Sequence, residues 1–383
     1  MKNKLKIVYI SIEDSNDLKS WSGSVHAIKK SLIETYRAEV FVIDKLKIKK
    51  TPFLFFQKIK SKLTNKYFDV NRDKTVLKYF VKEIKNRLPK EYDFILASSS
   101  LPITYLDVDK PIYFYTDATF HSMLDYYFMS NSWSKKSIQD GNYHEKRAIK
   151  NAAGIFYASH WAKNDAVSFY NADPKKIEVV LFGANNVLKK DLNAVKSMIT
   201  KRLEEPLIRF LFVGVDWERK GGNTVIETLK LLEKEGINVQ LDLVGIPKIP
   251  IDNIPNFVVN HGFLNQNKTK DKEILENLYL AAHFLFVPSR QECLGVVFVE
   301  ASALGIPAIT TNTGGIPSIV KNNSTGYTLD PDATPETYKN ILLELLKNKD
   351  KYKEIALNAY QHYTEKSNWY VIGNKIIDIF EKK

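Results

Sequence analysis

The stretch "HFLFVPSRQECLGVVFVEASALGIPAITTN", residues 283–312, contains the pattern that decides the fold. Its opening apolar run ends at Pro288 and Ser289 and predicts a buried strand, and the closing "IPAITTN" predicts a second one. Between them, "GVVFVEASALG" has apolar residues at helical spacing and stops at Gly305, a residue type that commonly ends helices. Strand, loop, helix and strand in this order predict one unit of a parallel α/β sheet.

Two glutamates stand at defined places in this unit. Glu292 lies on the loop after the first strand, and Glu300 lies inside the helix. Open α/β sheets bind ligands at this carboxyl edge, beside helix N-termini that attract anions. A carboxylate repels a phosphate but accepts hydrogen bonds from hydroxyl groups, so the pair suits a sugar or a ribose. Taken alone, the same residues are equally consistent with a solvated loop charge and an exposed helix charge.

Strands and helices alternate along most of the 383 residues, a length that suits two domains. The segment 186–206 contains no strand and predicts the connection between them. Two doubly wound, Rossmann-like α/β domains are therefore expected, over residues 1–187 and 207–365, joined by a connection at 188–206. The predicted strands cover residues 6–11, 39–44, 93–99, 112–117, 154–159, 177–183, 208–215, 239–246, 257–263, 283–289 and 307–312.

The composition indicates in which cellular compartment the chain works and what kind of partner it binds. The single cysteine, Cys293, excludes an internal disulfide framework and fits a reducing compartment. The first apolar run ends at Glu13, too early for a signal peptide or a membrane span, so a cytoplasmic location is expected. The net charge is +12, and residues 29–90 alone contain 18 Lys and Arg against 6 Asp and Glu. A basic segment on a neutral body points to an anionic partner.

The second half resembles a known family. The ordered set "FLFVGVDWERKGG", "LDLVG", "VNHGF", "FVPSRQECLGVVFVEASALGIPAITTNTGGIPSIV" and "GYTLD" is similar to retaining glycosyltransferases of the GT-B fold, specifically the family-4 group with its E-x7-E signature. The resemblance covers roughly residues 205–345. It implies two Rossmann-like domains facing across a cleft, with a closing helix at residues 366–383 that returns to the N-terminal domain.

The resemblance also implies a donor site. The donor would be a nucleotide-diphospho-sugar, with UDP favoured, and no cofactor or metal is expected. Arg219 and Lys220 match the family's basic pair that neutralises the diphosphate. Glu292 would face donor sugar hydroxyls and Glu300 the ribose hydroxyls. The backbone positions expected beside the donor in this half are Gly214, Leu294, Gly295 and Val296.

The first half matches the family at scattered positions. Gly23 follows the first strand, where relatives carry a glycine-rich loop near the diphosphate. Asp117 ends the strand at "YTD", where relatives place a polar residue that reaches the donor sugar or the acceptor, and His121 is a less favoured alternative. Gly183, with Asn185, is expected to line the cleft. In "TGGIPSIV", Ser318 stands where relatives usually have an acid, but both glycines are present.

These features predict a retaining, metal-independent glycosyltransferase of the hexosyltransferase type. It would act on a glycan or lipid-linked glycan acceptor in bacterial surface polysaccharide or glycolipid synthesis. A double displacement needs a nucleophile close to the anomeric carbon, and the family match places neither glutamate there. Same-face substitution, with the leaving phosphate deprotonating the acceptor hydroxyl, is the family's usual explanation, and the sequence does not decide between the two.

A membrane partner is suggested by residues 53–66. Aromatic and aliphatic residues alternate there with lysines, as in a helix that lies in an anionic membrane interface. We expect peripheral binding at the inner face of the plasma membrane. The apolar face would be Phe53, Leu54, Phe55, Phe56, Ile59 and Leu63, surrounded by Lys58, Lys60, Lys62 and Lys66.

Other functions stay open at this point. Asp107 and Asp109 form a D-x-D pair, which metal-dependent glycosyltransferases use to hold a divalent cation. Sugar-nucleotide epimerases and phosphorylases also use paired Rossmann-like domains. The basic pI of 9.3 would fit a nucleic-acid-binding protein, although no nucleic-acid motif is present and no nucleic-acid partner is expected. A catalytically silent subunit of a partner enzyme is disfavoured by the intact Glu292, Glu300, Arg219 and Lys220 set.

Overall fold

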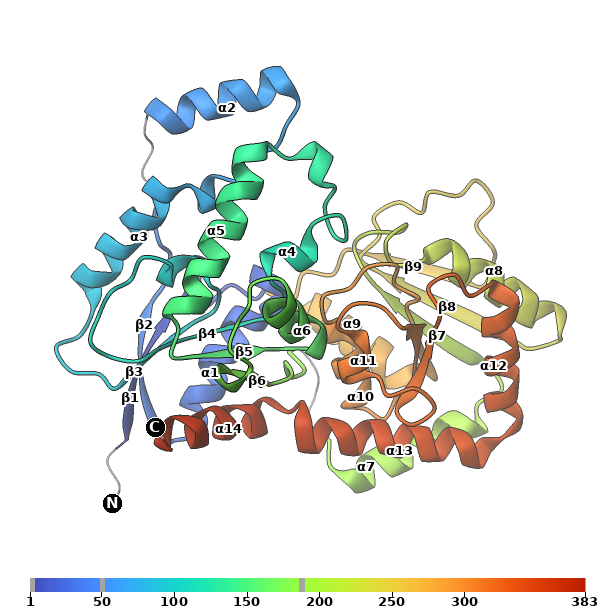
Figure 1. Cartoon of the computed structure of the whole chain (residues 1–383). Coiled ribbons are helices and arrows are strands. Elements are labelled where there is room, and N and C mark those ends of the chain that lie inside the picture. The colour runs from blue at the N-terminus through green and yellow to red at the C-terminus, as the bar shows by residue number, and fades with distance from the viewer. Residues whose placement is uncertain (1–3, 49–51, 186–189, 383) are drawn as a thin grey trace. The chain divides into compact units, whose positions relative to one another are not determined.

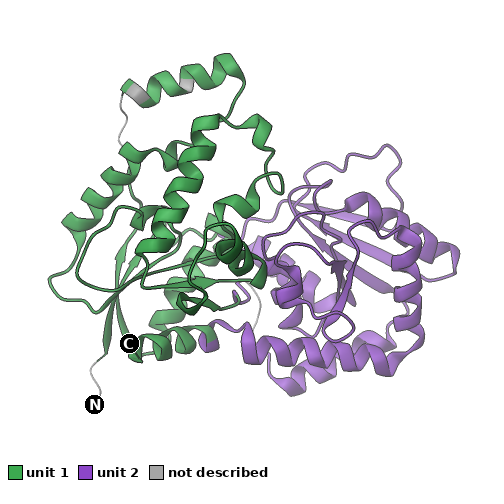
Figure 2. Cartoon of the chain, in the orientation of Figure 1, with its two compact units in different colours: residues 1–181, 372–383 green, residues 182–371 purple. Residues whose placement is uncertain are grey.

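The computed structural model of the chain describes residues 4–48, 52–185 and 190–382, without the side chains of Phe53 and Lys58. The chain forms two compact units, residues 1–181 with 372–383 (unit 1) and residues 182–371 (unit 2), which Figure 2 shows in different colours. The expected boundary at 187/188 lies outside the described residues. The described part of the expected connection, residues 190–206, has no strand, and its helix α7 (Leu192–Glu204) packs on α13 (Lys349–Lys366) and belongs to unit 2.

Unit 1 is built on a six-stranded sheet in which every pairing is parallel, with helices on both faces (Figure 1). Buried apolar runs form its central strands, as expected for a parallel sheet that is covered on both sides. The strand order is β2-β1-β3-β4-β5-β6. The strands are β1 (Leu5–Ile10), β2 (Ala38–Ile43), β3 (Phe94–Ala97), β4 (Ile112–Thr116), β5 (Gly154–Tyr157) and β6 (Ile177–Val179).

Alternate residues of these strands face opposite layers. Ile95 and Phe114 join one buried cluster with Leu77 and Phe80 of α3. On the other face, the ring of Phe94 stacks on a helix from the chain's C-terminal end. The helices of unit 1 are α1 (Ser24–Ile33), α2 (Pro52–Thr64), α3 (Lys74–Arg87), α4 (Phe120–Met123), α5 (Lys135–Asn151) and α6 (His160–Ser168), completed by the end of α14 (Trp369–Glu381).

Helix α14 passes from unit 2 to unit 1 at Ile372. Its Phe380 ring stacks on Phe94 at 4.6 Å between ring centroids and lies 4.8 Å from Tyr113. Arg37 donates to Asp378 at 2.7 Å, which adds an ion pair at the surface of the same helix. The predicted apolar residues Ile372, Ile376 and Phe380 are buried in this packing, whereas Tyr370 is exposed.

Unit 2 repeats the doubly wound plan with the strand order β12-β11-β10-β7-β8-β9, also fully parallel. The order reverses between β7 and β10, which are neighbours in the sheet but distant in sequence. Every strand named in the sequence analysis is present, and β12 is an additional one. The strands are β7 (Ile208–Val213), β8 (Val239–Val244), β9 (Val258–Gly262), β10 (Phe284–Phe286), β11 (Ala308–Thr311) and β12 (Gly326–Leu329).

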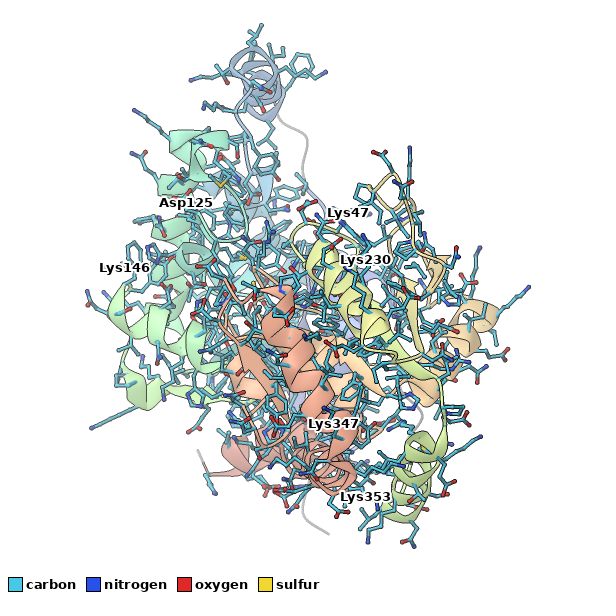
Figure 3. All side chains as sticks on the ribbon, turned by 90° about the vertical axis from the view of Figure 1, so that its right-hand side faces the viewer. Lys47, Asp125, Lys146, Lys230, Lys347 and Lys353 are labelled. Atoms are coloured by element: carbon cyan, nitrogen blue, oxygen red, sulfur yellow. The ribbon has the colours of Figure 1, made fainter. Side chains whose placement is uncertain are left out.

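Helices of unit 2 pack aromatic side chains on the sheet: Tyr352 of α13 lies 5.4 Å from Phe284, and Tyr338 of α12 (Pro335–Lys347) lies 5.3 Å from Phe286, between ring centroids. The outer surfaces of the helices are charged, and Lys230, Lys347 and Lys353 lie there (Figure 3). None of the described helices is both long and apolar enough to cross a membrane. The other helices of unit 2 are α8 (Gly222–Lys234), α9 (Thr269–Ala281), α10 (Val296–Ser302) and α11 (Ile316–Ile319).

Candidate active site

The point where the strand order of unit 2 reverses determines where the site lies. Strands β7 and β10 run side by side, and the chain leaves their carboxyl ends in opposite lateral directions. Loops that diverge in this way leave a crevice in which doubly wound folds bind ligands. The loop after β7 contains Arg219 and Lys220, and the loop after β10 contains Glu292. The fold therefore brings these three predicted residues to one place.

Lys220 and Glu292 form a buried ion pair at this position. The ammonium of Lys220 donates to Oε2 of Glu292, and each residue is only 7% exposed. Nη1 of Arg219 lies 3.8 Å from the same carboxylate oxygen and donates to the carbonyl of Gln291 at 3.0 Å. Buried charges are retained in proteins when they are paired, as here. The group thus holds these two cations against the buried Glu292 and the exposed Asp216, whose carboxylate lies 3.6 Å from Nε of Arg219.

Backbone contacts hold the two loops together. The amide of Arg290 donates to the carbonyl of Arg219 at 2.7 Å. A Cβ on Gly221 would lie 2.3 Å from the carbonyl oxygen of Pro288, and φ of Gly221 is +75°, so only glycine fits there. Such close backbone approach fixes the position of the neighbouring Lys220 relative to the loop after β10.

A third loop closes against the same region. The amide of Gly315 donates to the carbonyl of Glu292 at 3.0 Å. A Cβ on Gly315 would lie 1.9 Å from the carbonyl oxygen of Cys293, which again requires glycine. The glycine pair of "TGGIPSIV" thus supports the backbone of the glutamate loop. Ser318 is buried behind it on α11.

Glu300 is held by a partner that the sequence did not indicate. Its Oε2 accepts a hydrogen bond from the Tyr279 hydroxyl at 2.8 Å, and both residues are buried. Burial raises the pKa of Tyr279 well above its ordinary value of 10, and the nearby Glu300 carboxylate raises it further, so the hydroxyl remains a donor. Tyr279 lies on α9 and Glu300 on α10, so their juxtaposition depends on tertiary packing and has no local sequence signal.

The predicted backbone positions differ in their surroundings. Leu294 is buried and Val296 half-buried, on either side of Gly295, which caps the start of α10 in the left-handed region. Gly214 lies directly under the side-chain stem of Lys220, since a Cβ on Gly214 would be 2.8 Å from Cγ of that lysine. These contacts place the four residues in the loops that surround the Lys220–Glu292 pair.

Gly183 and Asn185 have a structural explanation in the packing of α14. A Cβ on Gly183 would lie 2.5 Å from the indole ring of Trp369, and Nε1 of Trp369 donates to Oδ1 of Asn185 at 2.9 Å. Both residues therefore position the start of the closing helix. Their expected role beside a ligand stays a prediction.

In unit 1, Trp21 links Asp117 to the turn that ends at Gly23. Nε1 of Trp21 donates to Oδ2 of Asp117 at 3.3 Å. Trp21 and Ser22 both have positive φ, 48° and 54°, in the short 3₁₀ turn that ends at Gly23. Positive φ is uncommon for non-glycine residues and clusters at functional sites. The sequence predicted Gly23 and Asp117 but missed Trp21.

His121 is more firmly positioned than the sequence suggested. Its Nδ1 lies 2.6 Å from Oδ1 of Asp165, and its ring stacks on Phe169 at 3.4 Å between centroids. Asp165 also accepts a hydrogen bond from the Thr119 hydroxyl. His121 follows β4, and Asp165 lies on α6, which follows β5, so the partnership arises at the carboxyl edge of adjacent strands.

Asp107 and Asp109 lie at the opposite edge of the sheet of unit 1, because they precede β4. Both are exposed and line a cavity of 580 Å³ together with Lys110, Arg147 and Lys176. They are separated from the carboxyl edge by the length of the strand. Over the described ranges, no group of three His, Cys, Asp or Glu side chains is arranged to hold a metal ion.

Comparison with known proteins identifies the region around the Lys220–Glu292 pair. Residues 197–362 match the family model described as "Glycosyl transferases group 1". The D-inositol 3-phosphate glycosyltransferase of Corynebacterium kroppenstedtii is 24% identical over 258 residues, which cover 62% of this chain and 55% of that protein. The chain thus spans little more than half the length of this relative.

A second relative and a solved structure are also similar to this chain. The capsular polysaccharide biosynthesis glycosyltransferase CapM of Staphylococcus aureus is 28% identical over 197 residues, 49% of this chain and 50% of that protein. The crystal structure of Anabaena Alr3699/HepE in complex with UDP-glucose has the same fold, with a TM-score of 0.63 and 14% identity over 99% of this chain and 100% of that one. The chain as a whole therefore has the GT-B fold, and its residues 197–362 are those that match the group 1 glycosyl transferases.

Proposed function

We propose that the chain is a retaining glycosyltransferase that moves a sugar from a nucleotide-diphospho-sugar to a hydroxyl of a glycan or lipid-linked glycan. The observation that carries the proposal is the buried Lys220–Glu292 pair, with Arg219 beside it, at the strand-order reversal of unit 2. This geometry offers positive charge for a diphosphate and a carboxylate for sugar hydroxyls within one small group.

Each residue then has a chemical role. When the bond between the anomeric carbon and the diphosphate breaks, its electron pair leaves with the diphosphate, and Arg219 and Lys220 stabilise the charge that develops. Glu292 accepts hydrogen bonds from the donor sugar, and Glu300, oriented by Tyr279, accepts them from the ribose. The acceptor oxygen forms the new bond on the same face of the sugar, and its proton passes to the departing phosphate oxygen.

The substrates are proposed from two supports. UDP is favoured as the nucleotide because the structure of Anabaena HepE contains UDP-glucose. A surface polysaccharide or glycolipid is favoured as the acceptor because CapM is named for capsular polysaccharide biosynthesis. Unit 1 would bind the acceptor, with Asp117 as the residue closest to the reaction.

Donor turnover by the purified chain tests the proposal. A panel of UDP-, GDP- and ADP-sugars is incubated with the wild type, Lys220→Met and the control Lys230→Met, whose lysine pairs with Glu227 at 2.9 Å on the outer face of α8. We expect hydrolysis or transfer of at least one donor by the wild type and the control, and its loss in Lys220→Met. If none of the sugars is turned over, the proposal is wrong.

Metal independence belongs to the same proposal. It is supported by the two cations at the predicted diphosphate position, which can neutralise the leaving group themselves. We expect the rate to be unchanged in EDTA. Loss of activity in EDTA, followed by recovery on addition of manganese, would contradict metal independence. It would favour the alternative in which Asp107 and Asp109 hold a divalent cation.

We also propose that α2 attaches the chain to the cytoplasmic face of an anionic membrane. Phe56, Ile59 and Leu63 lie at helical spacing and are exposed, and α2 extends beyond the other helices of unit 1 (Figure 1). Lys60 and Lys62 are exposed on the same helix. Each basic residue near an anionic surface contributes about 1 kcal/mol. Leu54 differs from the expectation, because it is buried in the core and anchors the helix, and the side chains of Phe53 and Lys58 lie outside the described part.

Flotation with liposomes distinguishes attachment through α2 from a nonspecific effect of the net positive charge. The variant Lys60→Glu/Lys62→Glu/Lys66→Glu is compared with Lys230→Glu/Lys347→Glu/Lys353→Glu, which makes the same charge change on unit 2 (Figure 3). We expect the wild type and the unit 2 variant to float with anionic vesicles at low salt and the α2 variant to remain behind. Equal behaviour of the two variants would refute a role for α2.

A further inference from the structure

Unit 1 has a cluster of polar and aromatic side chains that the donor site does not use. Trp161, Asp165 and Phe169 follow one another at intervals of four residues along α6 and its end, so they share one face of the helix. The segment after β4 covers this face with His121 and Tyr126. We call these five residues the α6 cluster.

The α6 cluster lies at the edge where this fold binds ligands. His121 follows β4 and Trp161 follows β5, and these two strands are paired in parallel. Their carboxyl ends therefore meet at one edge of the sheet of unit 1, the edge at which doubly wound sheets bind ligands. Asp117, which directly follows β4, lies at the same edge.

The imidazole of His121 is fixed on two sides. Its Nδ1 is 2.6 Å from Asp165, and its ring stacks on Phe169 with an interplanar angle of 9°. The backbone amide of His121 donates to the Tyr170 hydroxyl at 3.0 Å, which in turn donates to Asn142 at 2.7 Å. The side chain is nevertheless 38% exposed. With Nδ1 turned to the carboxylate, Nε2 is the ring atom that can meet a ligand.

The aromatic part of the cluster is half-exposed. The rings of Tyr126 and Trp161 lie 5.1 Å apart at 45°; Trp161 also packs against the buried core of unit 1, and both residues are only partly exposed. Phe169 is 44% exposed, although it stacks on His121. Aromatic rings with an accessible face offer apolar area at low entropic cost, and the indole adds a polar handle.

We propose that the α6 cluster binds a pyranose ring of the acceptor. The apolar face of the sugar would stack on Trp161, and its hydroxyls would hydrogen-bond to Nε2 of His121, whose ring Asp165 positions. An accessible aromatic face beside a fixed polar pair matches a ring that is apolar on one face and bears hydroxyls around its rim. The inference rests on the proposed function and names the acceptor group that unit 1 contacts.

Direct sugar binding tests the proposal without turnover. The full chain is titrated with methyl glycosides of glucose, galactose, mannose, N-acetylglucosamine and N-acetylgalactosamine, and binding is followed by saturation-transfer NMR. We expect at least one glycoside to bind the wild type. Trp161→Ala should weaken it roughly tenfold, whereas Trp161→Phe should retain most of the affinity. The control Trp133→Phe changes a tryptophan of the same unit that packs on Phe128 at 4.4 Å and should have no effect.

Two substitutions of His121 separate ligand contact from structural support. Asn reproduces the Nδ1 donor toward Asp165 but removes Nε2, whereas Gln places an amide where Nε2 stood. His121→Asn should therefore keep thermal stability and lose glycoside affinity, and His121→Gln should keep part of the affinity. UDP binding by unit 2, measured in parallel, should be the same in every variant.

The outcomes are distinct. Wild-type glycoside affinity in both Trp161→Ala and His121→Asn would overturn the proposal. So would a panel in which no glycoside binds, including the case in which glycerol phosphate or inorganic phosphate binds in its place and identifies an anion site. Glycoside binding without turnover of any nucleotide-sugar would refute the proposed function and leave the sugar subsite standing.

Discussion

At the scale of single residues, the proposed donor site depends on charges that are buried together. Lys220 and Glu292 pair with one another, and Arg219 donates to the carbonyl of Gln291. Removing one member of a buried ion pair costs about 3–5 kcal/mol, because the remaining charge has no partner. The pair thus links the stability of unit 2 to the residues that we propose bind the diphosphate.

The two glutamates should have separable effects. Glu300→Gln is expected mainly to weaken nucleotide affinity, and Glu292→Gln mainly to slow turnover, because they face different parts of the donor. A hydrogen bond to a charged group contributes about 1.5–3 kcal/mol, so each effect should exceed roughly tenfold. Tyr279→Phe removes the 2.8 Å bond to Glu300 and should resemble Glu300→Gln in milder form. Steady-state kinetics with the identified donor measures both parameters, and wild-type values in both glutamate variants would refute the site.

A second residue-scale prediction concerns Glu145, which is buried in unit 1. Burial raises its pKa above the ordinary value of 4.5, although nearby Arg72 and the 2.6 Å hydrogen bond from Ser100 oppose the rise. A raised folded-state pKa means that this carboxyl stabilises the fold most below pH 4.5 and loses that contribution as pH rises through the raised value. Arg72 retains Asp69 as a partner at 3.2 Å when Glu145 is changed.

Glu145→Gln should therefore gain stability relative to the wild type between pH 4.5 and neutral pH. Urea denaturation at both pH values measures the two free energies of unfolding. The difference, variant minus wild type, should be more positive at neutral pH. An equal difference at the two pH values would show that ionisation of Glu145 does not contribute.

At the scale of elements, the closing helix α14 shows what the sequence pattern can predict. Its apolar spacing identified the face that is buried, and the family resemblance suggested its return to the N-terminal domain. The pattern also placed Tyr370 on that face, but this side chain is 53% exposed because α14 enters unit 1 only at Ile372. The residue at which a helix passes from one unit to the other depends on tertiary packing, so the spacing of apolar residues cannot predict it.

Phe380→Ala should strongly destabilise unit 1. The ring is 1% exposed between Phe94 and Tyr113, and truncation of a buried phenylalanine costs about 3–5 kcal/mol. Tyr370→Ala, on the exposed part of the same helix, should change the free energy of unfolding by about 0.5 kcal/mol or less. Chemical denaturation of the two variants checks this, and similar losses in both would contradict the packing of α14 on unit 1.

Neither β12 nor the burial of Leu54 was predicted from the sequence, because both depend on residues that are distant in the sequence. Strand β12 is only four residues long, and it forms because it pairs with β11, where Thr310 lies opposite Thr328. The helix over residues 52–64 carries both a core anchor, Leu54, and an exposed apolar face, and composition alone did not separate the two.

At the scale of the whole molecule, the fold was predictable because parallel strands buried on both faces are continuous apolar runs. The placement of Arg219, Lys220 and Glu292 in the loops after β7 and β10 was predictable because their sequence context is ordered and specific. The partners of other predicted residues were not: Tyr279, Trp21 and Asp165 reach Glu300, Asp117 and His121 across the fold. The interval of four between Trp161, Asp165 and Phe169 was visible in the sequence, but nothing local showed what would cover that face.

The central claim is that the carboxyl edge of unit 2 holds a nucleotide diphosphate, and calorimetric titration with UDP tests it most directly. We predict that the wild type and Lys230→Met bind UDP equally. Lys220→Met should bind at least roughly tenfold more weakly, because it lacks a charge-assisted hydrogen bond to the diphosphate. The double variant Lys220→Met/Glu292→Gln removes both members of the ion pair and leaves no unpaired buried charge, so it should stay equally weak while it recovers stability. UDP affinity in the folded double variant equal to that of the wild type would contradict the account.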